Sequence, residues 1–365
     1  MTICIIGAGL TSLSLAQNLV NKKINVHIYD VNENKDLLSN RTIGISQNNF
    51  EFFKKEILDI KKINFWKIKK IEIFSEKLGN QKVLNFTKND KGLFFMVKND
   101  ELKQSLSISL SKNKLFNKKI IRNENCYKKL LSENKYDLII NCDSKNLIGR
   151  KYFSKTIDKT YNNFAYINTL QHKKLDNSTA VQVFTKYGPI AYLPISAKQT
   201  SVVYSLDFNK DKFNEDQIID LIKKHNPKYL INNMSKFENF ELKSSNLRNY
   251  YYKNIGAFGD CLHKIHPLAG QGFNMTVRDI RAISSIIEDK INLGLQIDSL
   301  VLKEFEKKTK NINFIFSNSI DFLFEIFNFN KKIKNTTFDK TLKYFGNKEL
   351  IKDTLVKLAD RGLKI

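Results

Sequence analysis

The sequence predicts a mixed α/β fold in which a parallel-sheet domain is interleaved with an antiparallel-sheet domain and followed by a helical region. First, an apolar strand at 2–6 runs through two glycines into an amphipathic segment at 13–20, as at the start of a βαβ unit. Second, four apolar runs between 161 and 206 follow one another with short polar breaks, which is typical of an antiparallel sheet. Third, apolar residues recur at helical spacing from 299 to 329. With 365 residues, the chain can hold two interlocked domains.

The first candidate site is the glycine turn after the strand at 2–6. A second strand, 25–29, ends in an acid at about the distance beyond the glycines where dinucleotide-binding folds place one for a ribose. The third position of the G-x-G-x-x-G pattern is a serine, which is small, so we expect the helix to shift slightly and binding to be retained. A purely structural turn is the alternative. The candidate residues are Gly7, Gly9, Leu10, Thr11, Ser12 and Asp30.

The second candidate site lies late in the chain, where a strand at 255–258 leads through a turn into a helix at 274–291. The carboxylate of Asp260 can accept hydrogen bonds from sugar-like hydroxyl groups. Gly270 and Gly272 let a ligand approach the helix N-terminus, whose unpaired N–H groups stabilise negative charge.

The segment GDCLHKIHPLAGQGFNM at 259–275 resembles the second flavin-binding motif of the FAD-dependent aromatic hydroxylases, the class A flavoprotein monooxygenases, and is closest to the branch that hydroxylates ubiquinone precursors. The resemblance implies a Rossmann-type FAD-binding domain interleaved with a β-sheet substrate domain and a C-terminal helical region. It implies that Asp260 meets the ribityl chain and that the helix start faces the pyrimidine end of the flavin. The cofactor residues implied in this segment are Asp260, Pro267, Gly270, Gln271, Gly272, Phe273 and Asn274.

The resemblance also divides the chain. The FAD-binding domain is expected at 1–70, 98–160 and 251–295, the substrate domain at 71–97 and 161–250, and the C-terminal helices at 296–365.

Local patterns predict the remaining elements in chain order. They are a helix at 47–56, hairpin strands at 68–74, 82–86 and 93–97, a helix capped by Asp100, strands at 136–141, 163–170, 180–185, 189–195 and 200–205, a helix at 214–224, a strand at 237–242, and a last helix at 350–362.

Three further cofactor contacts follow from the resemblance. Arg41 matches the residue along the ribityl-pyrophosphate arm, and Asn99 matches a position that touches FAD; an exposed surface arginine and an ordinary helix start are the alternatives. Asp143 and Arg150 keep the spacing of a motif assigned to flavin and nicotinamide contacts. Ser144 replaces the glycine of that motif, which bears on the nicotinamide step more than on FAD.

The substrate residues are expected on the hairpin at 184–194, which resembles the family segment whose apolar face covers the aromatic ring. Phe184, Tyr192 and Leu193 are the candidates for this wall, and core packing explains each of them equally well. Pro267 is the candidate catalytic residue, because it resembles the family residue whose backbone carbonyl can face the substrate hydroxyl. No other side-chain acid or base stands out.

Metal and disulfide sites are not expected. His263 and His266, with Asp260, have a spacing that invites a metal interpretation, but they flank the flavin motif and the other histidines are scattered. The four cysteines contain no C-x-x-C pair, which suits a reduced cytoplasm.

The chain has a formal net charge of +24. Its lysines are spread along the whole sequence among Asn and Ile, as a codon-level bias would produce, so we expect no nucleic-acid partner; a basic nucleic-acid binder is the alternative. No basic segment precedes the first strand, and polar residues interrupt the apolar stretch at 314–329. We therefore expect a cytoplasmic protein without a signal peptide, with a peripheral position at the inner membrane as an option.

The resemblance implies that NADH or NADPH reduces FAD, that dioxygen adds to the reduced flavin, and that the flavin hydroperoxide transfers oxygen to the ring of a polyprenylated phenol in ubiquinone biosynthesis. Other ubiquinone-biosynthesis proteins and a membrane surface are possible partners. Two alternatives remain: a flavin-dependent reductase of the same fold, and a non-catalytic flavin-bound member of a biosynthetic complex, which Ser12 and Ser144 would suit.

Overall fold

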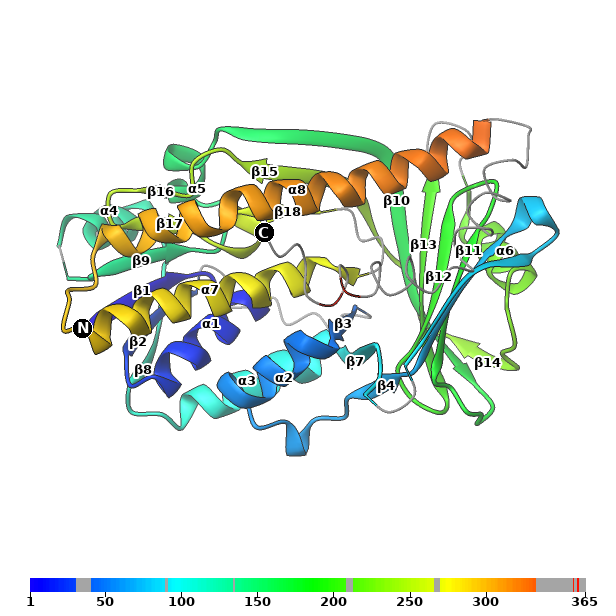
Figure 1. Cartoon of the computed structure of the whole chain (residues 1–365), viewed down its shortest axis with the longest axis horizontal. Helices are drawn as coiled ribbons and strands as arrows, with labels where there is room; N and C mark the ends of the chain where they lie inside the picture. The colour runs from blue at the N-terminus through cyan, green and yellow to red at the C-terminus, as the bar shows by residue number, and fades with distance from the viewer. Residues whose placement is uncertain are drawn as a thin grey trace.

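The computed structural model describes residues 1–30, 41–88, 91–133, 135–207, 213–265 and 270–332, together with Lys357 and Asp360. Two sheets lie at opposite ends of the elongated molecule (Figure 1), a six-stranded sheet near the N-terminus and a nine-stranded sheet. The mixed α/β prediction is therefore confirmed.

The six-stranded sheet begins with the predicted strand β1 (Thr2–Ile6), which is parallel to β2 (Asn25–Asp30) and to β9 (Leu138–Asn141). Its residues Ile3 to Ile6 are fully buried, as expected for a central strand covered on both faces. The order across the sheet is β16 (Tyr251–Tyr252), β17 (Ile255–Ala257), β9, β1, β2 and β8 (Phe116–Ile120). All pairs are parallel except β16 with β17.

Helices cover this sheet. The strand β1 continues through the glycine turn into α1 (Leu10–Asn21), which packs against α3 (Asn99–Ser111) and α7 (Gly272–Asn292). The long helix α8 (Ser299–Lys332) contacts α7, β15, β16 and β17 and runs toward the other sheet (Figure 1). The remaining helices are α2 (Gln47–Glu56), α4 (Glu124–Ser132), α5 (Leu147–Tyr152) and α6 (Glu215–Lys224), with short 3₁₀ turns η1 (Ile60–Lys62), η2 (Glu76–Leu78) and η3 (Gly259–Cys261).

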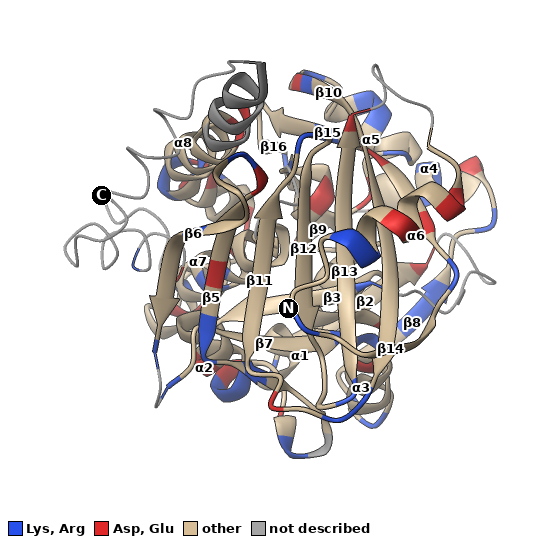
Figure 2. Cartoon of the chain, turned by 90° about the vertical axis from the view of Figure 1, so that its right-hand side faces the viewer, with Lys and Arg blue, Asp and Glu red and all other residues tan. Residues whose placement is uncertain are grey.

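The nine-stranded sheet contains all four predicted strands between 161 and 206. Its order is β18 (His263–Lys264), β15 (Glu238–Leu247), β10 (Thr156–His172), β13 (Gln199–Asp207), β12 (Pro189–Pro194), β11 (Thr179–Phe184), β5 (Lys70–Ser75) and β6 (Gln81–Thr87), with β14 (Ile231–Met234) paired to β10. Every pair is antiparallel except β11 with β5. One face packs on α6, in front of the sheet in Figure 2, through a core that includes Val181, Tyr192, Tyr204 and Ile222.

Two local predictions were wrong. The apolar run at 93–97 does not continue the hairpin of β5 and β6: it forms β7 (Phe94–Lys98), which pairs with β3 (Thr42–Ser46) and β4 (Trp66–Ile68) in a separate three-stranded sheet. Asp100 is not the cap of α3, because the helix begins at Asn99 after Lys98 and Asp100 lies in its first turn. The helix predicted at 350–362 lies outside the described residues, apart from Lys357 and Asp360, and the domain division stays a prediction.

The charges agree with a dispersed composition. Lysine and arginine segments are scattered over the face in Figure 2, both at its edges and near its centre. In the part of the chain that the structure describes, no helix combines the length and the apolar character needed to cross a membrane.

Candidate functional site

A cavity of about 1160 Å³ lies between the carboxyl ends of β1, β2 and β9 and one face of the nine-stranded sheet. Both glycine turns open onto it, since Gly7 and Gly9 of the first turn and Gly270 and Gly272 of the second line the same space. The volume slightly exceeds the roughly 300–1,000 Å³ of ordinary small-molecule pockets. The cavity can therefore take a large ligand from the helical side and a second molecule against the sheet.

The first glycine turn brings bare backbone to the cavity. The Gly7 N–H donates to the Tyr29 carbonyl at 2.8 Å, and Gly7 has a φ of +106°, a conformation that favours glycine. Gly9 caps α1, and a side-chain carbon at Gly9 would meet no atom within 4 Å. The unpaired N–H groups at the start of α1 can thus approach an anionic ligand without steric hindrance.

The replacement of the third glycine by Ser12 is accommodated in the structure. Ser12 is buried in α1, and its hydroxyl lies near Gly7 and Cys142. Burial raises the pKa of the Cys142 thiol to about 12, so this cavity-lining sulfur is neutral and unreactive near pH 7. Ser12, Leu10 and Thr11 all line the cavity.

The acid of the first unit also faces the cavity. Asp30 Oδ2 lies 2.9 Å from Nζ of Lys118 on β8, and both residues line the space. Along the neighbouring helix α3, a row of polar residues faces the same way: Asn99, Lys103, Ser107 and Ser111. Sequence reasoning identified only Asn99. The spacing of four residues, which puts them on one helix face, is the signal that could have revealed the other three.

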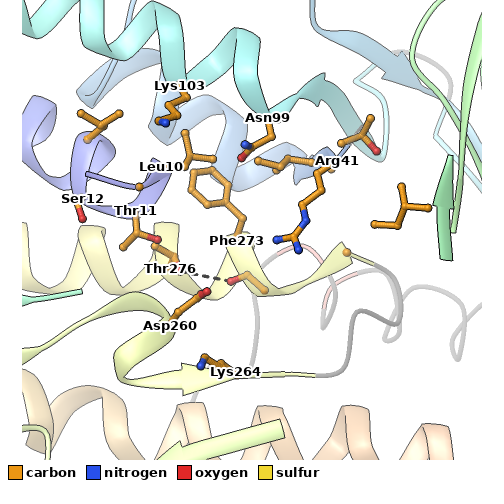
Figure 3. Close-up of a pocket in the computed structure, with 18 of the residues that line it drawn as sticks. Leu10, Thr11, Ser12, Arg41, Asn99, Lys103, Asp260, Lys264, Phe273 and Thr276 are labelled. Atoms are coloured by element: carbon orange, nitrogen blue, oxygen red, sulfur yellow. Dashed lines mark hydrogen bonds between the residues drawn. The ribbon is translucent and has the colours of Figure 1, made fainter. Parts of the chain in front are cut away.

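Arg41 lies between the helical side of the cavity and the nine-stranded sheet. Its guanidinium stands 4.8 Å from the ring centre of Phe240 on β15, an arrangement that permits cation–π attraction. Figure 3 shows Arg41 and Asn99 on one side of the space and Asp260 and Lys264 on the other, with Phe273 between them.

The second glycine turn presents the start of α7, a helix of 21 residues. Gly270 has a φ of +63°, and a side-chain carbon there would meet no atom within 4 Å; at Gly272 it would meet only Ile265, at 3.9 Å. Asp260, Phe273 and Thr276 line the cavity beside these glycines. The positive end of the α7 dipole therefore lies at the cavity.

Two predicted residues of this segment do not line the cavity. Gln271 is 3% exposed, and its amide atoms have no hydrogen-bond partner in the described parts of the chain. Asn274 is fully buried and connects elements instead: its Nδ2 donates to the Gly44 carbonyl at 2.8 Å, and its Oδ1 accepts from the Ser46 N–H at 2.8 Å and from Asn49 Nδ2 at 3.0 Å. Pro267, the predicted catalytic residue, lies outside the described residues, as does His266.

The Asp143 segment lines the cavity next to the second turn. Ser144, which stands where the family has glycine, accepts a hydrogen bond from Lys264 Nζ at 3.3 Å. The residue that departs from the family pattern therefore contacts the segment at 259–275 directly. Arg150 is directed elsewhere, with an exposed side chain 4.0 Å from Glu124.

Strand alternation decides which predicted wall residues face the cavity. Leu193 lines it, whereas Tyr192 is buried on the opposite face, where its hydroxyl donates to the Ile222 carbonyl of α6 at 2.7 Å. Phe184 is half-buried at the end of β11 and does not line the cavity. Sequence reasoning missed the other lining residues of this sheet, which are Ile71, Ile167, Ala180, Val181, Gln182, Pro189, Ala191, Val203, Ser205 and Phe240.

In the segment at 259–275, His263 has a structural partner. His263 Nε2 lies 2.5 Å from Asp279 Oδ2, and both side chains are buried. Among the residues that the structure describes, no three His, Cys, Asp or Glu side chains gather as a metal ion would require.

Comparison with known proteins finds relatives by sequence among the ubiquinone biosynthesis monooxygenases. No protein-family model matches the chain. The chain is 30% identical to the ubiquinone biosynthesis monooxygenase COQ6 of Dictyostelium discoideum over 57% of its own length, and the match spans about half, 52%, of that protein. With the COQ6 of Schizosaccharomyces pombe it is 22% identical over 99% of this chain and 92% of that protein.

Solved structures give the fold. The p-nitrophenol 4-monooxygenase PnpA of Pseudomonas putida superposes with a TM-score of 0.77, covering 100% of both chains at 12% identity. HpxO of Klebsiella pneumoniae, solved with FAD and uric acid, superposes with a TM-score of 0.69 over 98% of this chain and 96% of that one, also at 12% identity. The chain therefore has the fold of the class A flavoprotein monooxygenases, and its sequence is related to their ubiquinone-biosynthesis branch.

Proposed function

We propose that the chain is an FAD-dependent monooxygenase that uses NADH or NADPH and dioxygen to hydroxylate the ring of a polyprenylated phenol in ubiquinone biosynthesis. The observation that carries this proposal is the shared cavity: two glycine turns, each with an acid beside it, open on one space whose far side is a largely apolar sheet. The names of the COQ6 relatives support the pathway, and the FAD in the HpxO structure supports the cofactor.

The residues present fit FAD. The bare backbone at Gly9, Gly270 and Gly272 leaves room that a side chain would fill, as close approach of a dinucleotide requires. In the arrangement that the family resemblance implies, Asp30 would hold the ribose of the adenosine, and the start of α1 the pyrophosphate. Arg41 would lie along the ribityl-pyrophosphate arm, and Asp260 would hold the ribityl chain. The start of α7 would face the pyrimidine end.

When bound, FAD supplies the electron pair from NAD(P)H and the activation of dioxygen. The chain supplies the surroundings. The N-terminus of α7 stabilises negative charge in front of Gly272 and Phe273. The apolar side chains of the sheet, such as Ile167, Ala191 and Leu193, exclude water and hold the ring and its prenyl chain by contact.

The test is a set of measurements on purified protein. We expect a bound yellow chromophore that is released as FAD, NAD(P)H oxidation that a prenylated phenol stimulates, oxygen consumption, and a product one oxygen heavier by mass spectrometry. A flavin-dependent reductase would oxidise NAD(P)H without hydroxylating the ring. A non-catalytic flavin protein would show no substrate-stimulated oxidation.

A peripheral position at the inner membrane, and contacts with other ubiquinone-biosynthesis proteins, belong to the same proposal. Large apolar side chains on α8 are exposed and support it, namely Phe314, Ile315 and Phe322. We expect the protein to sediment with anionic lipid vesicles, and substitution of these three residues by serine to weaken that binding at constant salt.

A further inference from the structure

The sheet side of the cavity, here called the floor, consists of the lining residues of β5, β10, β11, β12, β13 and β15. Most of them are apolar, namely Ile71, Ile167, Ala180, Pro189, Ala191, Leu193, Val203 and Phe240; Val181 also borders the cavity, although it packs in the core against α6. The polar residues of the floor are Gln182 and Ser205, and none of its described residues is charged. A substrate group placed here meets hydrocarbon, one amide and one hydroxyl.

The register fixes where the amide lies. Gln182 pairs with Ala191, Ala191 with Val203, and Val203 with Ile167, so these four residues form one row across β11, β12, β13 and β10. Val181 and Val183, on either side of Gln182, belong to the core against α6, which places the Gln182 side chain on the cavity face. Its neighbour in the row, Ala191, is small and leaves the amide accessible from the centre of the floor.

The cations that line the cavity lie away from Gln182: Lys103 on α3, Lys118 on β8 and Lys145 after β9 belong to the helical side. Arg41 stands over Phe240 on β15, four strands from β11 in the sheet order, or roughly 19 Å at the usual strand spacing. Lys264 lies on β18, at the edge of the same sheet beyond β15, and is held by Ser144 beside the second glycine turn. Among the residues that the structure describes, a carboxylate near Gln182 would therefore be buried without a charged partner, which is strongly unfavourable.

We propose that the substrate occupies the floor as an uncharged ring, without a carboxylate, and that Gln182 is the specificity-determining residue that hydrogen-bonds its hydroxyl or another neutral polar substituent. This inference rests on the proposed function and narrows it to neutral phenols. An amide suits this role because it donates and accepts, and so can bind a hydroxyl, a methoxy or a carbonyl group.

Trp66 provides a readout that depends neither on turnover nor on flavin chemistry. It is the only tryptophan of the chain, and it packs against the buried cluster that contains Ile68 and Met96, which line the cavity. The experiment follows Trp66 fluorescence in protein supplemented with FAD, without NAD(P)H, during titration with 2-prenylphenol and with the two 2-prenylphenols that carry a carboxylate meta or para to the hydroxyl.

Wild-type protein is expected to bind the neutral phenol at least tenfold more tightly than either carboxylate. Gln182→Leu should weaken binding of the neutral phenol about tenfold, the worth of one buried hydrogen bond. Gln182→Lys should tighten binding of at least one carboxylate about tenfold. Tyr192→Phe, a change behind the sheet, should leave all three affinities unchanged.

Equal or tighter wild-type binding of a carboxylate, or an unchanged affinity for the neutral phenol in Gln182→Leu, would overturn the inference. The proposed function fails in a different way, through the absence of bound FAD or of ring hydroxylation. Because ligand preference is read from Trp66 alone, the two failures are distinguishable.

Discussion

His263 Nε2 lies 2.5 Å from Asp279 Oδ2 in the protein core, and Asn313 Nδ2 donates to the other oxygen of that carboxylate at 2.9 Å. The three residues come from β18, α7 and α8. Since β18 also carries Lys264 and α7 begins at the second glycine turn, this buried pair holds both parts of the site against the long helix.

Loss of the Asp279 carboxylate should destabilise the whole protein. Asp279→Ala leaves His263 and Asn313 buried without their partner, so we expect the free energy of unfolding to fall by about 3 kcal/mol. Denaturant titration measures it. The control is Lys310→Met, which removes the ion pair between Lys310 Nζ and Glu306 Oε1, 2.7 Å apart near the surface. It should lower the free energy of unfolding by less than about 1 kcal/mol. A similar small loss in Asp279→Ala would show that the buried pair does not hold these elements together.

A side chain at Gly9 should affect the ligand more than the fold. In Gly9→Ala the methyl group enters the open space of the cavity, so we expect FAD affinity to fall at least tenfold while the free energy of unfolding changes by no more than about 1 kcal/mol. Fluorescence titration with FAD measures the first quantity. Gly79→Ala should do the reverse, because Gly79 has a φ of +63° in a distant turn, and a side chain there costs about 1–2 kcal/mol. Unaltered FAD binding in Gly9→Ala would count against the first turn as the cofactor site.

Asp260 should contribute a hydrogen bond to the cofactor. Asp260→Ala removes a carboxylate acceptor at the cavity, and a hydrogen bond to a charged group is worth about 1.5–3 kcal/mol, so FAD should bind about 10 to 100 times more weakly. Equilibrium dialysis checks this. Asp158→Ala is the matched control, since that carboxylate lies on β10 and accepts a bond from Thr156; it should leave FAD affinity unchanged.

Adjacent residues of β12 should have opposite effects. Tyr192→Phe breaks the hydrogen bond to Ile222 behind the sheet, so it should lower the free energy of unfolding by about 1–2 kcal/mol and leave phenol binding unchanged. Leu193→Ala should weaken phenol binding, because the lost side chain faces the cavity. Unfolding and binding measured on both variants decide which face holds the substrate. The opposite outcome would restore Tyr192 as the wall.

Stability should fall when the pH drops below about 6.5. Burial lowers the pKa of His225, and the nearby charges of Lys224 and Lys186 lower it further. Glu76 Oε1, which lies 3.8 Å from Nε2, acts in the opposite direction but is outweighed by burial. The unfolded state, with a histidine pKa near 6.5, therefore binds the proton more readily than the folded state. The stabilisation is complete above that value and is lost as the pH falls. Denaturant titrations at pH 7.5 and 5.5 should show a shallower loss in His225→Gln than in wild type; parallel losses would contradict this origin.

Local patterns were sufficient for the backbone of the site. Strand, glycine turn and helix follow one another within a few residues at both Gly9 and Gly272, so the sequence predicts each turn, and the acids Asp30 and Asp260 come at fixed distances from them. Their convergence on one cavity is not visible in either local pattern, and it is what a single FAD bound by both turns, as the resemblance implies, requires. Local patterns could not predict that β7 pairs with β3. Three apolar runs in series, here at 68–74, 82–86 and 93–97, predict three neighbouring strands whether or not the strands pair with one another.

Side-chain direction was harder to predict. Both faces of the nine-stranded sheet are apolar, one against α6 and the other at the cavity. The alternation of side chains along a strand therefore assigns residues to two faces but does not show which face meets the ligand. That is why Tyr192 was chosen and Ala191 and Gln182 were missed. The motif at 259–275 has the same ambiguity: Gly272 lines the cavity, while Asn274 points into the protein.

The buried amide of Asn274 has a mechanical consequence. It joins the first residues of α7 to Gly44 and Ser46 of β3, so one buried side chain ties together the two cavity walls that these elements form. In the proposed enzyme we therefore expect any widening that admits a bulky prenylated molecule to occur along the sheet and not between α7 and β3.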